Sequence, residues 1–307
     1  MTMTRSLRAN AKARAPKIWA KSRPGALPMP ANRDISALTK SAVLDKWGEE
    51  AAGIRAVAPG DNVITMFDVI GEDFWSGGGV TAKKVAAQLR AIGDRPVEVQ
   101  INSPGGDMFE GIAIYNVLRE HPQDITVKIM GMAASAASLI AMAGDRVEIG
   151  VSSFIMIHNC WVLAMGNRHA MAEVAAWLAP FDQAMVDLYA LRTSEDADAI
   201  AKMMDAESWL SGTVAIDKGF ADALLPADQM KVDEDAQASD RKVNELRAME
   251  LTLVRAGYTR SEARARITKI KGDGTPGAAL DLETPTPGAG ETELAGALAG
   301  LLSTIRS

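Results

Sequence analysis

The chain has 307 residues, of which 48% are hydrophobic and 23% are charged, and its formal net charge is −6. This composition can bury a full core, and the acidic balance argues against nucleic acid as the main partner. No segment is apolar and long enough to span a bilayer, so no membrane association is expected. One cysteine excludes an internal disulfide framework and points to a reducing cytoplasm, and with only three histidines neither a metal site nor a cofactor is expected.

Residues 1–60 are expected to form a basic, largely disordered arm. The first 33 residues contain no acidic residue and three prolines between Pro24 and Pro30. They carry eight basic residues: Arg5, Arg8, Lys12, Arg14, Lys17, Lys21, Arg23 and Arg33. This segment has no apolar run of signal-peptide length, so it is not predicted to be a secretion signal.

Residues 61–225 alternate between strand and helix patterns. Strands are predicted at residues 62–70, 96–101, 125–130, 147–149 and 154–157, and helices at 81–92, 111–119, 135–143, 170–191 and 194–204. Such alternation implies an α/β fold with parallel strands and crossover helices. Ligand sites in these folds lie at the carboxyl ends of the strands.

Residues 226–307 are predicted to be a helical and linker tail. Two charged helices are expected at residues 232–256 and 258–271, a Gly/Pro/Thr linker at 272–290, and an amphipathic helix at 292–305. The tail is either a scaffolding or targeting segment or a solvated surface, which is the commoner use of charged helices.

Two strand ends have unusual sequences. Residues 102–107 place two adjacent glycines between a strand and a helix, where bare backbone N–H groups can approach a ligand, although a plain tight turn needs the same residues. Residues 131–138 place Ser135 at the first turn of a helix between alanines. Small neighbours leave the hydroxyl accessible, and the helix N-terminus favours an anion beside it, as an acyl-transfer nucleophile requires. Close helix packing through Ala and Ser is the alternative.

A serine nucleophile needs a base, and His158 is the candidate. It ends the apolar run at residues 154–157, so its imidazole would emerge at a strand terminus next to another strand–helix junction. His121 and His169 lie in polar or charged stretches. A buried histidine with a purely structural role is the alternative for His158.

Five motifs in order resemble those of the Clp protease proteolytic subunit family: NSPGG at 102–106, GMAASAA at 131–137, MIH at 156–158, WLS at 209–211 and GFAD at 219–222. The resemblance covers residues 61–225 and implies the Clp/crotonase fold of stacked β-β-α units, here with a helical C-terminal extension. It also implies that Ser135 is the nucleophile and His158 the base. The backbone N–H groups of Gly105 and Ala136 would form the oxyanion hole.

The third member of the triad departs from the family pattern. The family has an aspartate two residues before the aromatic residue of the WLS-type motif, and here Glu207 occupies that place. Glutamate can orient an imidazole with a different reach, so Glu207 is expected to be the acid and Asp205 remains the alternative.

The layout of a Clp-like core with an appended tail resembles the head-maturation proteases of tailed phages and prophages. This resemblance implies a serine endopeptidase that forms homo-oligomeric rings and cleaves capsid or scaffold precursors in the host cytoplasm, inside the assembling shell. The helix at 170–191 is the expected contact element of the ring. No phosphate-binding loop of an ATPase is present, so cleavage is expected to be ATP-independent or to depend on a partner. The alternatives are a catalytically silent ring-forming scaffold and, with less support, a crotonase-type acyl-CoA enzyme.

Overall fold

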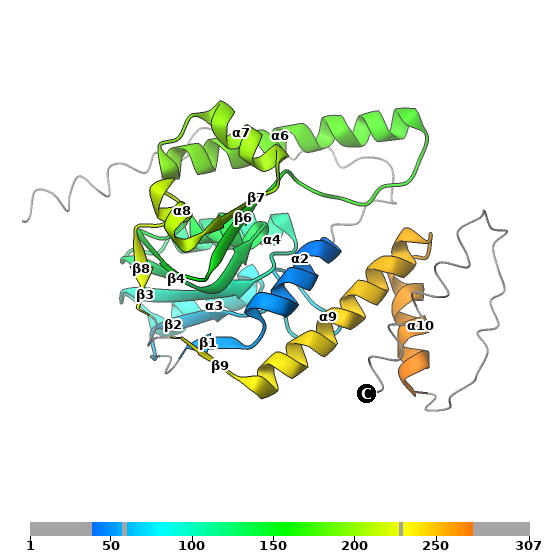
Figure 1. Cartoon of the computed structure of the whole chain (residues 1–307), viewed down its shortest axis with the longest axis horizontal. Coiled ribbons are helices and arrows are strands. Elements are labelled where there is room, and N and C mark those ends of the chain that lie inside the picture. The colour runs from blue at the N-terminus through cyan, green and yellow to red at the C-terminus, as the bar shows by residue number, and fades with distance from the viewer. Residues whose placement is uncertain (1–38, 57–59, 227–229, 273–307) are drawn as a thin grey trace, which may run out of the picture.

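The computed structural model describes residues 39–56, 60–226 and 230–272. Within these residues a seven-stranded sheet forms the centre, and five parallel strands follow the order β2-β3-β4-β5-β8 (Figure 1). These strands are β2 Val63–Met66, β3 Val97–Ser103, β4 Ile125–Ala134, β5 Arg146–Gly150 and β8 Ala223–Leu225. The parallel sheet expected from the strand–helix alternation is confirmed.

A second, smaller layer begins on the long strand β4. Residues 126–129 of β4 pair with β5, whereas residues 132–134 pair in parallel with β6, Phe154–Ile157. Strand β7, Ser208–Ser211, then pairs antiparallel with β6. Because β4 changes partners half-way, its carboxyl end and that of β6 leave the sheet side by side.

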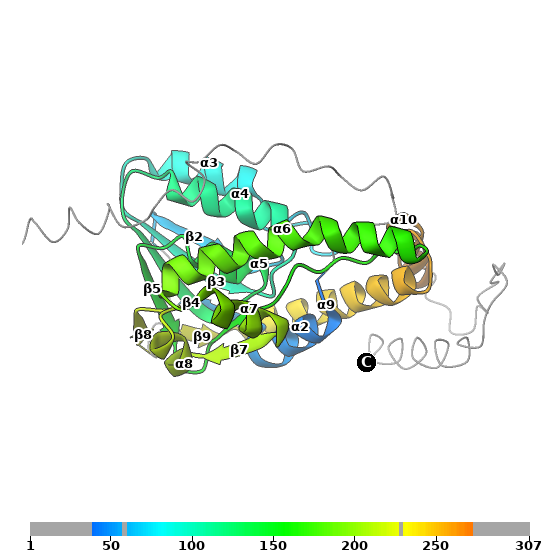
Figure 2. The ribbon, with the colours of Figure 1, turned by 90° about the horizontal axis from the view of Figure 1, so that it is seen from above.

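Helices α3, Ala82–Ile92, and α4, Met108–Arg119, lie on one side of the sheet, opposite α2, Ser41–Lys46, and α9, Glu234–Arg255 (Figure 2). Helix α3 begins as predicted, since Thr81 Oγ1 accepts a hydrogen bond from the backbone N–H of Lys84 at 3.3 Å. It ends at Gly93, whose φ of 70° favours glycine. Together with α5, Ala136–Ala141, these helices bury the main hydrophobic cluster against the sheet.

The opposite face is covered by the segment that was expected to belong to a disordered arm. Residues 41–56 instead form α2 Ser41–Lys46, a π-helical turn Trp47–Ala51 and strand β1 Ile54–Ala56. Trp47 is 1% exposed and packs with Met132 of β4, and its Nε1 donates to Asn102 Oδ1 at 3.1 Å. The arm prediction is therefore wrong for this part, because long-range burial outweighs the polar composition. Residues 1–38 lie outside the described part.

The tail begins as an integral part of the fold. Strand β9, Met230–Val232, pairs antiparallel with β1, and helices α9, Glu234–Arg255, and α10, Arg260–Gly272, follow. Both charged helices were predicted, but α9 packs on α2 and is not a detached surface helix. The boundary at residue 225 therefore does not separate two packed units. The predicted linker and last helix, residues 273–307, lie outside the described residues.

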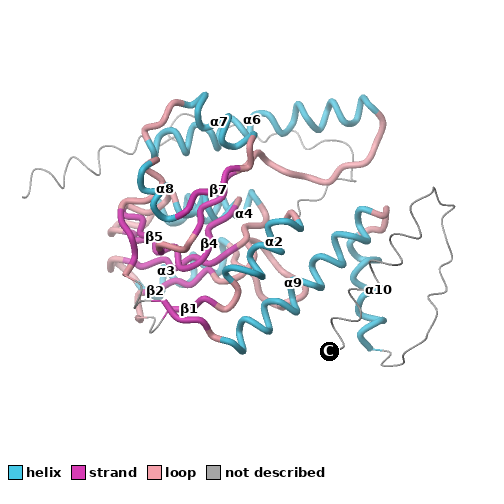
Figure 3. The backbone as a smooth tube through the Cα atoms, viewed as in Figure 1, coloured by secondary structure: helices cyan, strands magenta, loops and turns pink. Residues whose placement is uncertain are grey.

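Helix α6, Arg168–Thr193, is the longest described helix and is followed by α7, Ala197–Asp205, and α8, Gly212–Asp217. A long loop, residues 158–167, leads from β6 to the distant end of α6 (Figure 3). Among the described residues, no helix combines the length and the apolar character needed to cross a membrane.

Candidate active site

Ser135 lies at the junction of β4 and α5 in a backbone conformation that side chains rarely adopt. Its φ is 55° and its ψ is −125°, and its N–H donates to the Met156 carbonyl at 2.9 Å. For a residue with a Cβ this conformation costs on the order of 1–3 kcal/mol. The strained turn holds the hydroxyl between the small side chains of Ala134 and Ala136.

Ser135→Gly is therefore expected to have a free energy of unfolding about 1 kcal/mol higher than that of Ser135→Ala, because both variants lose the hydrogen bond to His158 and only glycine adopts positive φ without strain. Ser135→Ala is the control, since it removes the hydroxyl and retains the strained Cβ. Chemical denaturation of the three proteins provides the measurement. Equal stabilities of the glycine and alanine variants would argue against strain at this turn.

His158 lies beside Ser135 because β4 and β6, the strands that precede them, pair in parallel. Ala134 lies opposite Met156, so Ser135 follows this pair by one residue and His158 by two. The imidazole Nε2 lies 2.7 Å from Ser135 Oγ, which is a hydrogen bond of the length that proton transfer requires. Of the histidines considered in the sequence, His158 is the one brought to a serine.

Burial is the main influence on the charge of His158. The residue is 8% exposed, and burial, assisted by the nearby charge of Lys40, lowers the pKa of His158 to about 4. The charge of Glu207 and the main chain of Asn159 act in the opposite direction but are weaker. The imidazole is thus neutral near pH 7 and can accept a proton.

This pKa predicts a pH-dependent stability. The unfolded histidine has an ordinary pKa of 6.5, so between pH 6.5 and about 4 the unfolded chain binds more protons than the folded one. The free energy of unfolding should decrease as the pH is lowered through this window, and this residue should account for about 3 kcal/mol of the decrease. Urea unfolding of the wild type and of His158→Gln at several pH values tests this. The wild type should lose more stability than the variant, and parallel losses would contradict the prediction.

Neither of the predicted acids makes a hydrogen bond to His158. Glu207 forms an ion pair with Lys40, the residue before α2, and Asp205 accepts a hydrogen bond from Asn159 Nδ2 at 2.7 Å. His158 Nδ1 is buried and makes no hydrogen bond within the described part of the chain. Glu207 itself has a φ of 50°, which is rare for a residue with a side chain. The expected Glu207–His158 hydrogen bond is therefore absent, because Lys40 holds the carboxylate.

The predicted oxyanion-hole residues lie directly beside the serine. A Cβ on Gly105 would lie 2.7 Å from Ser135 Cβ and 3.0 Å from Ala136 N, so this approach requires glycine. Ala136 is the first residue of α5, and its N–H has no acceptor within the helix. The Gly105 N–H donates to Ser103 Oγ at 3.2 Å. It must exchange this partner before it can bind a substrate oxygen.

An apolar cavity of about 240 Å³ opens next to Ser135 and His158. Its lining includes Met108, Phe109, Leu139, Trp161, Trp177 and Met185, and Thr39 and Lys40 lie at one side. The cavity thus joins a nucleophile, a neutral base and an apolar binding surface. Among the described residues, no group of three His, Cys, Asp or Glu side chains is placed to hold a metal ion.

Comparison with known families gives a match between residues 79–228 and the Clp protease family. Through this region the chain belongs to the Clp protease family. This membership supports serine-type peptidase activity for the chain. The matched region contains the serine, the histidine and both candidate acids. Lys40, α9 and α10 lie outside it.

Three Clp relatives show how far the similarity extends. The ATP-dependent Clp protease proteolytic subunit of Ligilactobacillus salivarius strain UCC118 is 27% identical over 184 residues, which are 58% of this chain and 90% of that protein. The corresponding subunit of Deinococcus radiodurans is 27% identical over 150 residues, 47% of this chain and 74% of that protein. ATP-dependent Clp protease proteolytic subunit 3 of Streptomyces avermitilis is 26% identical over 173 residues, 54% and 75% of the two chains.

Proposed function

We propose that the chain is a serine endopeptidase with Ser135 as nucleophile and His158 as general base. The observation that carries the proposal is the 2.7 Å contact between Ser135 Oγ and His158 Nε2, at a strained turn beside an apolar cavity. As Oγ attacks the scissile carbonyl carbon, Nε2 takes its proton. The imidazolium then gives this proton to the leaving amine, and water releases the acyl group by the same steps in reverse order.

The backbone N–H groups of Ala136 and Gly105 would stabilise the negative oxygen of the tetrahedral intermediate. Ala136 is ready for this role, whereas Gly105 must release Ser103 Oγ. We propose that Glu207 is the triad acid in a conformation in which its carboxylate no longer pairs with Lys40 and accepts a hydrogen bond from His158 Nδ1. Asp205 is the weaker candidate because Asn159 already occupies its carboxylate.

The apolar cavity favours a large hydrophobic residue on one side of the scissile bond. Methionine and aromatic side chains dominate its lining, and burial of an apolar side chain there contributes about 25 cal/mol per Å². Protein substrates and a ring of identical subunits fit the family. Helix α6 is the proposed contact element, and Leu178 is a poor site for testing this because it also lines the cavity.

For the biological substrate we propose capsid or scaffold precursors of a phage-type head, cleaved without an ATPase in this chain. The support is the Clp-like core with long flanking segments, since the family match spans residues 79–228 of a chain of 307. One observation favours a second candidate, a catalytically silent scaffold: within the part of the chain that the structure describes, His158 Nδ1 has no acid partner.

A fluorophosphonate probe and intact mass spectrometry separate the two candidates. The wild type should gain the mass of one probe per chain, whereas Ser135→Ala should gain none. Co-expression with a capsid or scaffold precursor then tests the substrate, because only the wild type should cut it. An unlabelled wild type would favour the silent scaffold, and labelling without cleavage of the precursor would leave a peptidase with a different substrate.

A further inference from the structure

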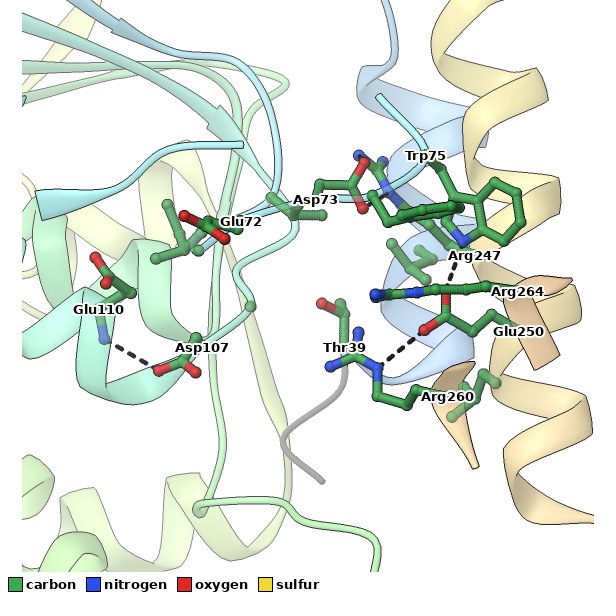
Figure 4. A pocket seen from close by; sticks show the side chains of 17 residues that line it. Thr39, Glu72, Asp73, Trp75, Asp107, Glu110, Arg247, Glu250, Arg260 and Arg264 are labelled. Carbon is green, nitrogen blue, oxygen red and sulfur yellow. Dashed lines mark hydrogen bonds and ion pairs between the residues drawn. The ribbon is translucent and has the colours of Figure 1, made fainter. Parts of the chain in front are cut away.

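A second cavity, of about 580 Å³, adjoins the one at Ser135 (Figure 4). The two cavities share Thr39, Gly106 and Asp107 in their linings, so they lie next to each other and one extended peptide has the length to contact both. The core supplies one wall through residues 69–75 and the start of α4. Helices α9 and α10 supply the opposite wall, and both lie outside the residues that match the family.

Two arginines of α10 project from this opposite wall. Arg260 Nε donates to Glu250 Oε1 at 2.9 Å, and Arg264 Nε donates to Glu250 Oε2 at 3.0 Å. Glu250 is 3% exposed and also accepts a hydrogen bond from Trp75 Nε1 at 2.6 Å, which fixes its position. Each guanidinium is hydrogen-bonded through Nε, and that of Arg264 also lies over the Phe74 ring at 4.8 Å, while the terminal nitrogens make no hydrogen bond to the described residues. Figure 4 shows both side chains facing the space opposite Asp107.

The charges at this wall do not cancel. Two guanidinium groups share one carboxylate, which leaves one positive charge in excess at the surface of the cavity. Arg247, the third arginine of the lining, is paired with both Asp68 and Asp73. On the core wall, Glu72 lines the cavity as well, and Asp107 and Glu110 accept backbone N–H groups at the starts of α4 and α3. All three carboxylates repel an anion. An anionic group is therefore favoured at the α10 wall only.

We propose that Arg260 and Arg264 form a subsite that binds an acidic side chain of the substrate peptide, away from the scissile bond. The inference rests on the proposed peptidase function and names part of its specificity. The guanidinium forks match a carboxylate geometrically, and Glu250 holds them in place before the ligand arrives, so little entropy is lost on binding. The extension that is absent from the family match thus selects the substrate.

The test measures peptide binding to the full-length Ser135→Ala protein by fluorescence anisotropy. Each labelled peptide contains one phenylalanine to occupy the apolar cavity and one Asp or Asn. The position of the Asp or Asn is varied on both sides of the phenylalanine. In one register the Asp peptide should bind about tenfold more tightly than its Asn partner. Arg260→Gln should remove most of this preference. Arg266→Gln is the matched control, since its guanidinium stacks on Tyr258 at 4.4 Å and does not line the cavity.

Loss of either arginine removes a donor from buried Glu250, and among the described residues Oε1 accepts from Arg260 alone, so Arg260→Lys and Arg264→Lys are made as conservative variants. Each lysine retains the charge and loses the fork, and it should weaken the Asp preference while thermal melting shows a folded protein. Equal binding of Asp and Asn peptides in every register, or an unchanged preference in the Arg260 and Arg264 variants, overturns the subsite. Fluorophosphonate labelling of the wild type tests catalysis separately, so failure of the subsite and failure of the peptidase proposal are distinguishable.

Discussion

Alanine in place of Ser135 or His158 is expected to reduce kcat for a cleaved peptide by at least about 10²-fold, with the double variant no slower than either single variant. The two groups act as one unit through the 2.7 Å contact, so removal of either leaves the other without a function. The remaining rate would come from binding and the oxyanion hole. The expected loss is moderate for a serine peptidase because Glu207 is not in place at the start.

Steady-state kinetics of the four proteins on one fluorogenic peptide give the measurement. Serine-to-alanine replacement at Ser138 is a poor control, because its hydroxyl binds the Ser135 carbonyl at 2.6 Å and supports the turn. Ser261, an exposed serine of α10, is a suitable control. Losses that multiply in the Ser135/His158 double variant would show that the two residues act independently and would contradict the proposed pair.

Lys40→Met is expected to increase kcat by at least about tenfold, with a ceiling near 10⁴-fold set by what a triad acid contributes in serine peptidases. The substitution removes the ammonium group that holds Glu207 and leaves most of the apolar stem. Glu207 is then free to reach His158 Nδ1, which has no hydrogen bond in the described residues. The change also removes a positive charge that opposes the imidazolium formed during the reaction.

Two comparisons decide the origin of such a gain. Lys83→Met removes an exposed ammonium of α3 and should leave kcat unchanged. Adding Glu207→Gln to Lys40→Met should remove the gain, since glutamine cannot stabilise an imidazolium as a carboxylate does. A gain that persists in this double variant would show that Lys40 acts through its charge alone and that Glu207 is not the acid.

Local patterns predicted most of the helices and strands of the core. Thr81 and Gly93 mark the ends of α3 in the sequence as they do in the structure, because capping depends on neighbouring residues. The position of β6 was also predicted, but its pairing with the second half of β4 depends on residues far apart in the chain. The family resemblance supplied that information for Ser135 and His158, which the structure brings together.

The features that sequence reasoning missed depend on long-range contacts. Trp47 is buried by β4, so a polar segment that resembles an arm becomes part of the core. Lys40 and Glu207 are 167 positions apart, and no local pattern indicates that they pair. In the sequence, the arginines of α10 look like part of an ordinary charged helix face. In the structure, two of them bind one buried glutamate of α9, which no local pattern indicates.

The pairing of β1 with β9 joins the two flanks of the chain mechanically. Ile54 lies opposite Val232, and Asp240 of α9 binds both the Gly53 N–H and the Arg55 guanidinium. A shortened chain that ends after residue 225 would lose these bonds and, with them, the support that α9 gives to α2. Since Lys40 directly precedes α2, a cut near the C-terminal flank would loosen the hold on Glu207. A cut in one flank of this chain is thereby expected to change the readiness of the serine, without any change at the serine itself.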